Sequence, residues 1–110
     1  MEQTTTAPGA GTASEDQLIP LCNVVLLDDD EHTYDYVMEM LQKLFMYSKA
    51  DAFRRAFEVD TTGRTVVLTC ERPPAEFARD QIHAFGADPR MAKSTGSMHA
   101  LVEPVGNSSS

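Results

Sequence analysis

The chain has 110 residues, a formal net charge of −8 and an isoelectric point near 4.6. Its nine Lys and Arg residues are scattered, whereas nucleic-acid binding needs clustered basic side chains, so we expect no nucleic-acid partner. No stretch approaches the ~20 apolar residues that a membrane helix needs. The N-terminus also lacks the basic and apolar regions of a signal peptide. We therefore expect a soluble, cytoplasmic protein that does not contact the membrane.

Met1 is the only large apolar residue between the start of the sequence and about Asp16. Such a segment cannot bury enough surface to offset the entropy lost on ordering. We expect a flexible N-terminal arm over residues 1–20, one folded domain over residues 21–105 and a disordered tail over residues 106–110. Nothing in the sequence indicates an oligomer, so a monomer is expected.

The first predicted elements are a strand and two helices. Residues 23–27 form a short apolar run that predicts a buried strand, and Thr33 is a candidate cap for the helix that follows. Ser48 and Asp51 resemble a capping box at the start of a second helix. The expected apolar face of the first helix is Tyr34, Val37, Met38, Leu41, Leu44 and Phe45, and that of the second is Ala52, Phe53, Ala56, Phe57 and Val59.

A turn at Gly63 separates the second helix from a predicted strand at residues 65–70. Pro73 and Pro74 open a third helix, and Gly86 suits a left-handed cap at its end. The expected inner face of this helix is Phe77, Ala78, Gln81, Ile82 and Phe85. Weak alternation over residues 97–102 predicts a last strand. The order β-α-α-β-α-β predicts a small α+β domain, a three-stranded antiparallel sheet packed by three helices.

The sequence carries no signature of catalysis or of a cofactor. Cys22 and Cys70 lie in apolar runs, so we expect reduced core thiols rather than a disulfide, a zinc site or a nucleophile. No Gly-rich phosphate loop, Ser elbow or His-Glu-x-x-His motif occurs. We therefore expect no enzymatic activity and no cofactor.

Four consecutive acids at residues 28–31 stand between the first strand and the first helix. They could cap the helix, whose dipole favours carboxylates at this end. They could instead hold a metal, since Asp28, Asp30 and His32 alternate, and with Asp60 they could form a metal-dependent enzyme site. The calcium-loop glycine and distant glutamate are absent, however. A third interpretation is a cation trap, in which carboxylates hold an ammonium beside an apolar slot near Tyr34.

Several segments of the chain together form a familiar series; they are residues 24–30, 34–45, 58–64, 75–76, 81–83, 96–98 and 103–104. In their sequence and spacing these segments resemble the Clp protease adaptor family ClpS, over residues 23–104, essentially the whole predicted domain. The order of elements expected from the residues alone agrees with that family.

The resemblance implies a bacterial receptor for N-degrons. Such an adaptor binds substrates that begin with a large hydrophobic residue and delivers them to a hexameric Clp unfoldase of the ClpA or ClpC type, with help from its N-terminal arm. The implied first residues are Phe, Tyr, Trp and Leu, with Ile or Val as an alternative. An adaptor that has kept the pocket but lost the protease partner remains a second possibility.

The resemblance also implies the binding residues. Asp28 stands where the family has Asn, Asp29 matches a family Asp, and Asp60 replaces a family His; these three would accept hydrogen bonds from the α-amino group. Asp60 could alternatively be a solvent carboxylate at a helix end. The implied side-chain slot is lined by Leu26, Tyr34, Val37, Ala56, Val59 and Met98, with Asp30 and His32 at its rim.

Two departures from the family bear on specificity and delivery. Tyr34 and Ala56 stand where the family often has methionines, so the slot has a different shape. Pro73 and Ala78 stand where the family has an acid and a lysine that dock the unfoldase, with Glu76 and Arg79 nearby. The chain thus resembles either a divergent natural branch or a protein tuned only to recognise N-termini.

Overall fold

The computed structural model describes residues 19–106. The predicted arm and tail lie outside these residues, apart from Ile19, Pro20 and Gly106. The elements follow the predicted β-α-α-β-α-β order. They are β1 (Leu21–Leu27), α1 (Tyr34–Phe45), α2 (Lys49–Thr62), β2 (Arg64–Glu71), α3 (Arg72–His83) and β3 (Ala100–Pro104). The predicted α+β class with a three-stranded antiparallel sheet is confirmed.

The strand β1 lies in the centre of the sheet, with β2 on one side and β3 on the other. Both neighbours run antiparallel to it. Cys22 pairs in register with Cys70, and both thiols are free. The register shifts where Val24 pairs with Leu68 and Val25 with Val66, so Val67 is the additional residue of a β-bulge.

Local signals set the helix ends. The Thr33 hydroxyl accepts a hydrogen bond from the backbone N–H of Tyr36 and caps α1, and the Ser48 hydroxyl does the same for α2 from Asp51. Gly63 ends α2 at φ 93°, a left-handed conformation that favours glycine. Prolines occupy the first turn of α3, as predicted. Gly86 also has a positive φ, but α3 already ends at His83 with Ala84 as its cap.

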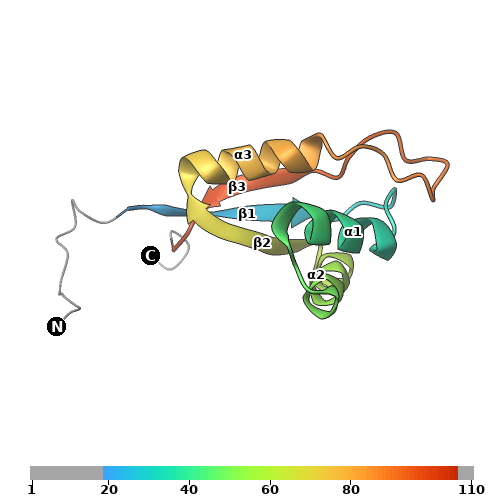
Figure 1. Ribbon diagram of the computed structural model, residues 1–110, viewed down its shortest axis with the longest axis horizontal. Helices are drawn as coiled ribbons and strands as arrows, with labels where there is room; N and C mark the ends of the chain where they lie inside the picture. Colours follow the sequence, from blue (N-terminus) through green and yellow to red (C-terminus); the bar gives the residue numbers. More distant parts are fainter. Residues whose placement is uncertain (1–18, 107–110) are drawn as a thin grey trace.

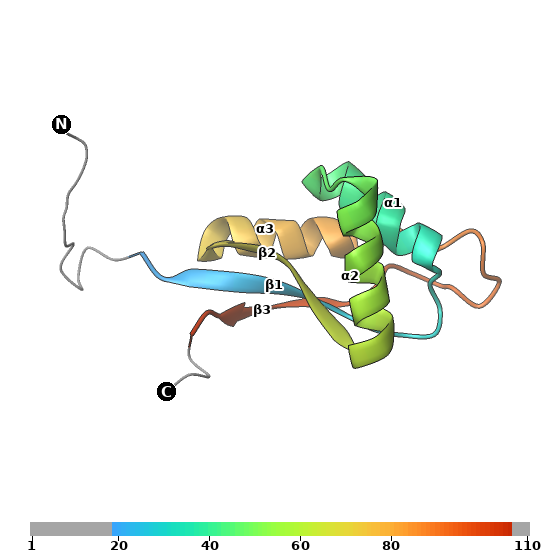
Figure 2. The same ribbon diagram turned by 90° about the horizontal axis from the view of Figure 1, so that it is seen from below.

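The helices gather around the sheet as two groups (Figures 1 and 2). α3 contacts all three strands, while α1 and α2 pack on each other and α2 also contacts β2. Figure 1 shows α1 and α2 together at the end of the sheet where β1 leads into the acidic loop. None of the helices within residues 19–106 is long and apolar enough to cross a membrane.

The core differs from the sequence expectation at three aromatic residues. Phe53, Phe57 and Phe77 are 50%, 54% and 64% exposed, although they were expected on inner faces. The neighbouring small residues face inward instead, because they let the helices approach their partners closely. The buried residues of α2 are Ala52, Ala56 and Val59, and those of α3 are Ala75, Ala78 and Ile82.

The last strand also differs from its predicted range. β3 begins at Ala100 rather than near residue 97, because residues 84–99 form a long connection from α3. Met98 lies in that connection and is 2% exposed.

Candidate functional site

A small cavity lies where β1, α1, α2 and the 84–99 connection meet, with a volume of about 30 Å³. Polar and apolar side chains share its wall. The lining residues are Asp28, Asp29, His32, Thr33, Tyr34, Val37, Ala56, Val59, Asp60 and Met98. The structure therefore brings nine of the eleven predicted site residues around one cavity, and Thr33 joins them.

Each wall of the cavity follows from the local fold. The N–H of Asp28 donates a 3.0 Å hydrogen bond to the carbonyl of Gly63, which ties the end of β1 to the end of α2. Ala56, Val59 and Asp60 are three and four residues apart, so they share one face of α2. The Thr33 cap starts α1 immediately before Tyr34.

Three carboxylates, those of Asp28, Asp29 and Asp60, line this cavity. No Lys or Arg among residues 19–106 forms an ion pair with Asp28 or Asp60. Partial burial raises the pKa of Asp28, and the charges of Asp60, Asp29 and Asp30 raise it further, against a lowering hydrogen bond from the Asp29 backbone. An added positive charge would relieve this repulsion. Such perturbed groups in a concave site are typical of functional positions.

Asp29 is held by its neighbours in the loop. Its carboxylate accepts a 2.9 Å hydrogen bond from the backbone N–H of Glu31 and lies 2.8 Å from Nδ1 of His32. The other ring nitrogen of His32 lies 2.7 Å from the Gly96 carbonyl, and the side chain is only 2% exposed. His32 thus links the acidic loop to the connection that follows α3.

Tyr34 and Asp60 meet across the cavity from α1 and α2. The phenolic hydroxyl donates a hydrogen bond to Asp60 Oδ2 at 2.9 Å. The Tyr34 ring also lies against the ring of Phe53, with centroids 5.7 Å apart. The Asp60 carboxylate is therefore aimed at this cavity, rather than only at solvent.

Two predicted site residues lie elsewhere. Leu26 is fully buried in the hydrophobic core, because its position in the central strand turns it towards the helices. The Asp30 side chain is 89% exposed and lies 3.4 Å from the Lys93 ammonium. The helix cap comes from Thr33 rather than from the acidic run. No group of three or more His, Cys, Asp or Glu side chains within residues 19–106 is arranged to hold a metal ion.

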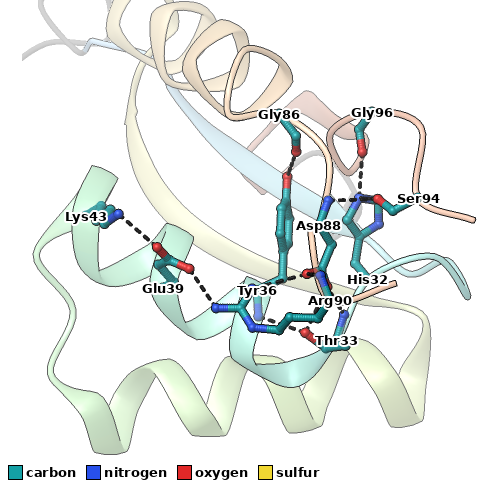
Figure 3. A network of polar contacts seen from close by, with 10 residues as sticks. All are labelled: His32, Thr33, Tyr36, Glu39, Lys43, Gly86, Asp88, Arg90, Ser94 and Gly96. Carbon is teal, nitrogen blue, oxygen red and sulfur yellow. Dashed lines mark hydrogen bonds and ion pairs between the residues drawn. The ribbon is translucent and has the colours of Figure 1, made fainter. Parts of the chain in front are cut away.

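Sequence reasoning missed a buried polar network behind the cavity (Figure 3). Asp88 is 1% exposed and accepts hydrogen bonds from the N–H and the hydroxyl of Thr33, each at 2.8 Å. It also accepts hydrogen bonds from the backbone N–H and from one guanidinium nitrogen of Arg90. The second terminal nitrogen of that guanidinium donates to Glu39. The hydroxyl of Tyr36 donates to the Gly86 carbonyl. No motif or periodicity around Asp88 in the sequence indicated this network.

Comparisons with known proteins agree on one family. The family described as ATP-dependent Clp protease adaptor protein ClpS matches residues 19–91. An ATP-dependent Clp protease adapter protein ClpS from a Synechococcus species is 30% identical over 78 residues, which cover 70% of this chain and 86% of that protein. The ClpS protein of Nocardia farcinica is 37% identical over 62 residues, 56% of this chain and 58% of that protein.

A solved structure extends the agreement to the fold. It is Agrobacterium tumefaciens ClpS2 bound to L-phenylalaninamide, 26% identical, with a TM-score of 0.68. The match covers 79% of this chain and 99% of that one. The expectation of an adaptor rather than an enzyme is confirmed by these matches. The chain belongs to the ClpS family of ATP-dependent Clp protease adaptors.

Proposed function

We propose that this chain binds the free α-amino group and the bulky hydrophobic side chain of a protein's first residue, and delivers that protein to an ATP-dependent Clp protease. One observation carries the proposal. Asp28 and Asp60 converge on a cavity whose other wall is apolar, and neither has a cationic partner among residues 19–106. An α-ammonium supplies the missing positive charge and can donate hydrogen bonds to both carboxylates.

The roles of the three carboxylates follow from the interactions that each already makes. Asp29 is engaged by Glu31 and His32, so it would contribute mainly negative charge and a fixed loop. Asp28 has a raised pKa and no Lys or Arg partner within the described part of the chain, so it would gain most from the ammonium. Asp60, on the opposite wall of the cavity, would accept a further hydrogen bond from the same ammonium.

The apolar wall would receive the side chain of the first residue. Val37, Ala56, Val59 and Met98 form it, and each is at most 4% exposed. Because the relative bound to L-phenylalaninamide holds a free amine next to an aromatic ring, it supports Phe as a ligand of this chain. We propose Phe, Tyr, Trp and Leu as preferred first residues, with Ile or Val as the alternative.

The proposed partner for delivery is a hexameric Clp unfoldase of the ClpA or ClpC type, acting in the cytoplasm. Of the two positions expected to dock it, Pro73 is exposed but Ala78 is 3% exposed and offers little surface. Glu76 and Arg79 on α3 are half-buried, so part of each side chain remains accessible to a partner. Any docking on α3 would therefore use the exposed side that carries Pro73 and Glu76.

The test is fluorescence binding of short peptides that differ only in residue one, Phe, Leu, Val, Ala or Glu, with a dye at the C-terminus. We expect Phe and Leu peptides to bind and their N-acetylated forms not to bind. Asp28→Ala should weaken binding at least about tenfold, since it removes a charge-assisted hydrogen bond. Asp30→Asn is the matched control, because it removes a charge from the same loop but away from the cavity.

Equal binding of free and acetylated peptides would show that the amine is not recognised. An equal effect of Asp30→Asn and Asp28→Ala would mean that the loop acts only through its total charge. Delivery needs a separate assay: degradation of a fluorescent protein with N-terminal Phe by a Clp unfoldase and its protease. Peptide binding without faster degradation would support the binder that has lost its protease partner.

A further inference from the structure

A surface groove on the outer faces of α1 and α2 is separate from the amine cavity. Its lining residues are Met38, Lys49, Ala50, Phe53 and Arg54. Met38 is half-buried and the other four are exposed, with Phe53 at 50%. Methionine, aromatic and arginine side chains are enriched at binding surfaces, and an exposed apolar floor with charged residues at its rim is typical of one. We call this surface the outer groove.

The outer groove adjoins the amine cavity. The ring of Tyr34 lines the cavity, and its centroid lies 5.7 Å from that of Phe53, which lines the groove. The helices α1 and α2 that carry these rings lie side by side (Figure 2). The other apolar residues of the cavity belong to the core and are at most 4% exposed. A chain whose first residue occupies the cavity therefore has an exposed path outward on the Tyr34 side.

The two ends of this path carry opposite charge. Three carboxylates line the cavity, whereas the basic side chains of Lys49 and Arg54 border the groove. Lys49 forms no ion pair with another residue in the range 19–106. Arg54 pairs with Asp51, but both side chains are more than half exposed, and surface pairs of this kind contribute little. A peptide with its free amine at the cavity and an acidic side chain at the groove would match both ends.

The spacing of side chains along α2 sets which peptide residues would reach the groove. Asp60, Phe53 and Lys49 are seven and four residues apart, so they share one face of the helix. At about 1.5 Å per residue, Phe53 lies about 10 Å and Lys49 about 16 Å from Asp60 along the helix axis. An extended peptide advances about 3.3 Å per residue. With its first residue at Asp60, such a peptide reaches Phe53 with its fourth residue and Lys49 with its sixth.

We infer that the outer groove is a second subsite for the substrate chain, which binds an apolar side chain at position four on Phe53 and Met38 and an acidic one at position six beside Lys49. The inference rests on the proposed function and adds the sequence class of the substrates. The apolar contact supplies most of the selectivity, because it removes exposed ring and thioether surface from water. The acidic contact stays solvated, so it adds less and weakens with salt.

The experiment measures binding of peptides that begin with phenylalanine, continue in serine and glycine, and carry a dye at the C-terminus. Leucine replaces serine at position four, and glutamate or lysine stands at position six. We expect leucine to tighten binding about three- to tenfold, which corresponds to partial burial of one side chain. The glutamate peptide should bind about two- to fivefold more tightly than the lysine peptide at low salt, and this difference should shrink in about 0.5 M salt.

Two variants assign these effects to the groove. Phe53→Ser should abolish the gain from leucine, and Lys49→Glu should reverse the preference at position six. The readout is a ratio between two peptides on the same variant, so an indirect effect of Phe53 on the cavity through Tyr34 cancels. Phe77→Ser and Arg72→Glu are the matched controls, because these exposed side chains lie on α3 and line neither the cavity nor the groove.

Equal binding of the leucine and serine peptides, with the free amine still required, would overturn the subsite and leave the amine site in place. An equal gain from leucine at position eight would also overturn it, since the groove would then set no register. A dimer in analytical ultracentrifugation that Phe53→Ser dissociates would assign the groove to a second copy of the chain instead. Failure of every free-amine peptide to bind would overturn both the proposed function and the subsite.

Discussion

Asp88 accepts hydrogen bonds from both the backbone N–H and the hydroxyl of Thr33, at 2.8 Å each, across 55 residues of sequence. Thr33 is the cap of α1, so this contact fixes the start of the helix that carries Tyr34 and Val37. It also holds the connection after α3, which brings Met98 to the cavity. The shape of the site therefore depends on a residue that does not line it.

Replacing Asp88 should destabilise the protein in a pH-dependent way. Burial alone would raise its pKa, but hydrogen bonds from Thr33 and Arg90 outweigh burial and lower the pKa from 3.8 to about 2. Because the folded-state value is lower than the unfolded one, the ionised carboxylate stabilises the native state above about pH 4, and this contribution is lost as the pH falls towards 2. The shift corresponds to roughly 2 kcal/mol. We expect Asp88→Asn to lower the free energy of unfolding by about that much at pH 7, measured with urea.

The difference between wild type and Asp88→Asn should shrink as the pH is lowered to 3. Asp80→Asn is the control, because that side chain is 66% exposed and its pair with Arg79 is a surface one. A difference that stays constant with pH would show that the carboxylate charge is not the stabilising feature.

Binding of a free-amine peptide should weaken in acid through Asp28. Partial burial and the charge of Asp60 raise its pKa, with smaller contributions from Asp29 and Asp30. A ligand ammonium favours the ionised carboxylate, so the dissociation constant should rise as the pH falls through the raised pKa. Asp60→Asn removes the negative charge that contributes most to the raised pKa of Asp28. The loss of binding in acid should therefore move to lower pH. Fluorescence titrations between pH 3 and 7 measure its midpoint, and an upward shift would contradict the assigned cause.

The paired thiols should be slow to react in the folded protein. Burial raises the pKa of Cys70, and Cys22 and Glu71 raise it further, while Cys22 itself is 3% exposed. Since the thiolate is the nucleophile, alkylation by a maleimide at pH 7 should be at least about tenfold slower than in urea. Cys22→Ala and Cys70→Ala assign the two rates. Rapid labelling of native Cys70 would mean that the edge of the sheet opens easily.

The elements of the fold could be predicted because their signals are local. The caps Thr33 and Ser48, the prolines of α3 and Gly63 act within a few residues, and each marks the boundary that the structure has. The acidic loop could be predicted from its four consecutive acids, whereas the grouping of Asp60 and the apolar residues with this loop came from the family resemblance, because these residues lie on separate elements. The Asp88 contact could not be predicted, since it joins residues 55 apart in a segment without periodicity.

The orientation of α2 and α3 was harder to predict than their existence. Successive helix residues are about 100° apart, so Ala52 and Ala56 form one stripe and Phe53 and Phe57 the next. Both stripes have helical periodicity, and hydrophobicity favours the phenylalanines. Tertiary packing decides otherwise: the alanine stripe is buried where α2 packs against α1 and β2, because small side chains let these elements approach closely.

The burial of the small residues, with the phenylalanines exposed, predicts how two substitutions change the stability of the protein. Phe57 is 54% exposed, so Phe57→Ser should change the free energy of unfolding by less than about 1 kcal/mol. Ile82 is fully buried on the inner face of α3, so Ile82→Ala should cost about 2–5 kcal/mol, from lost burial and the cavity left behind. Urea unfolding at pH 7 measures both. If Phe57→Ser lowered the free energy of unfolding as much as Ile82→Ala, the Phe53 and Phe57 side chains would have to be buried in solution. The outer face of α2 would then be a packed surface rather than an exposed one.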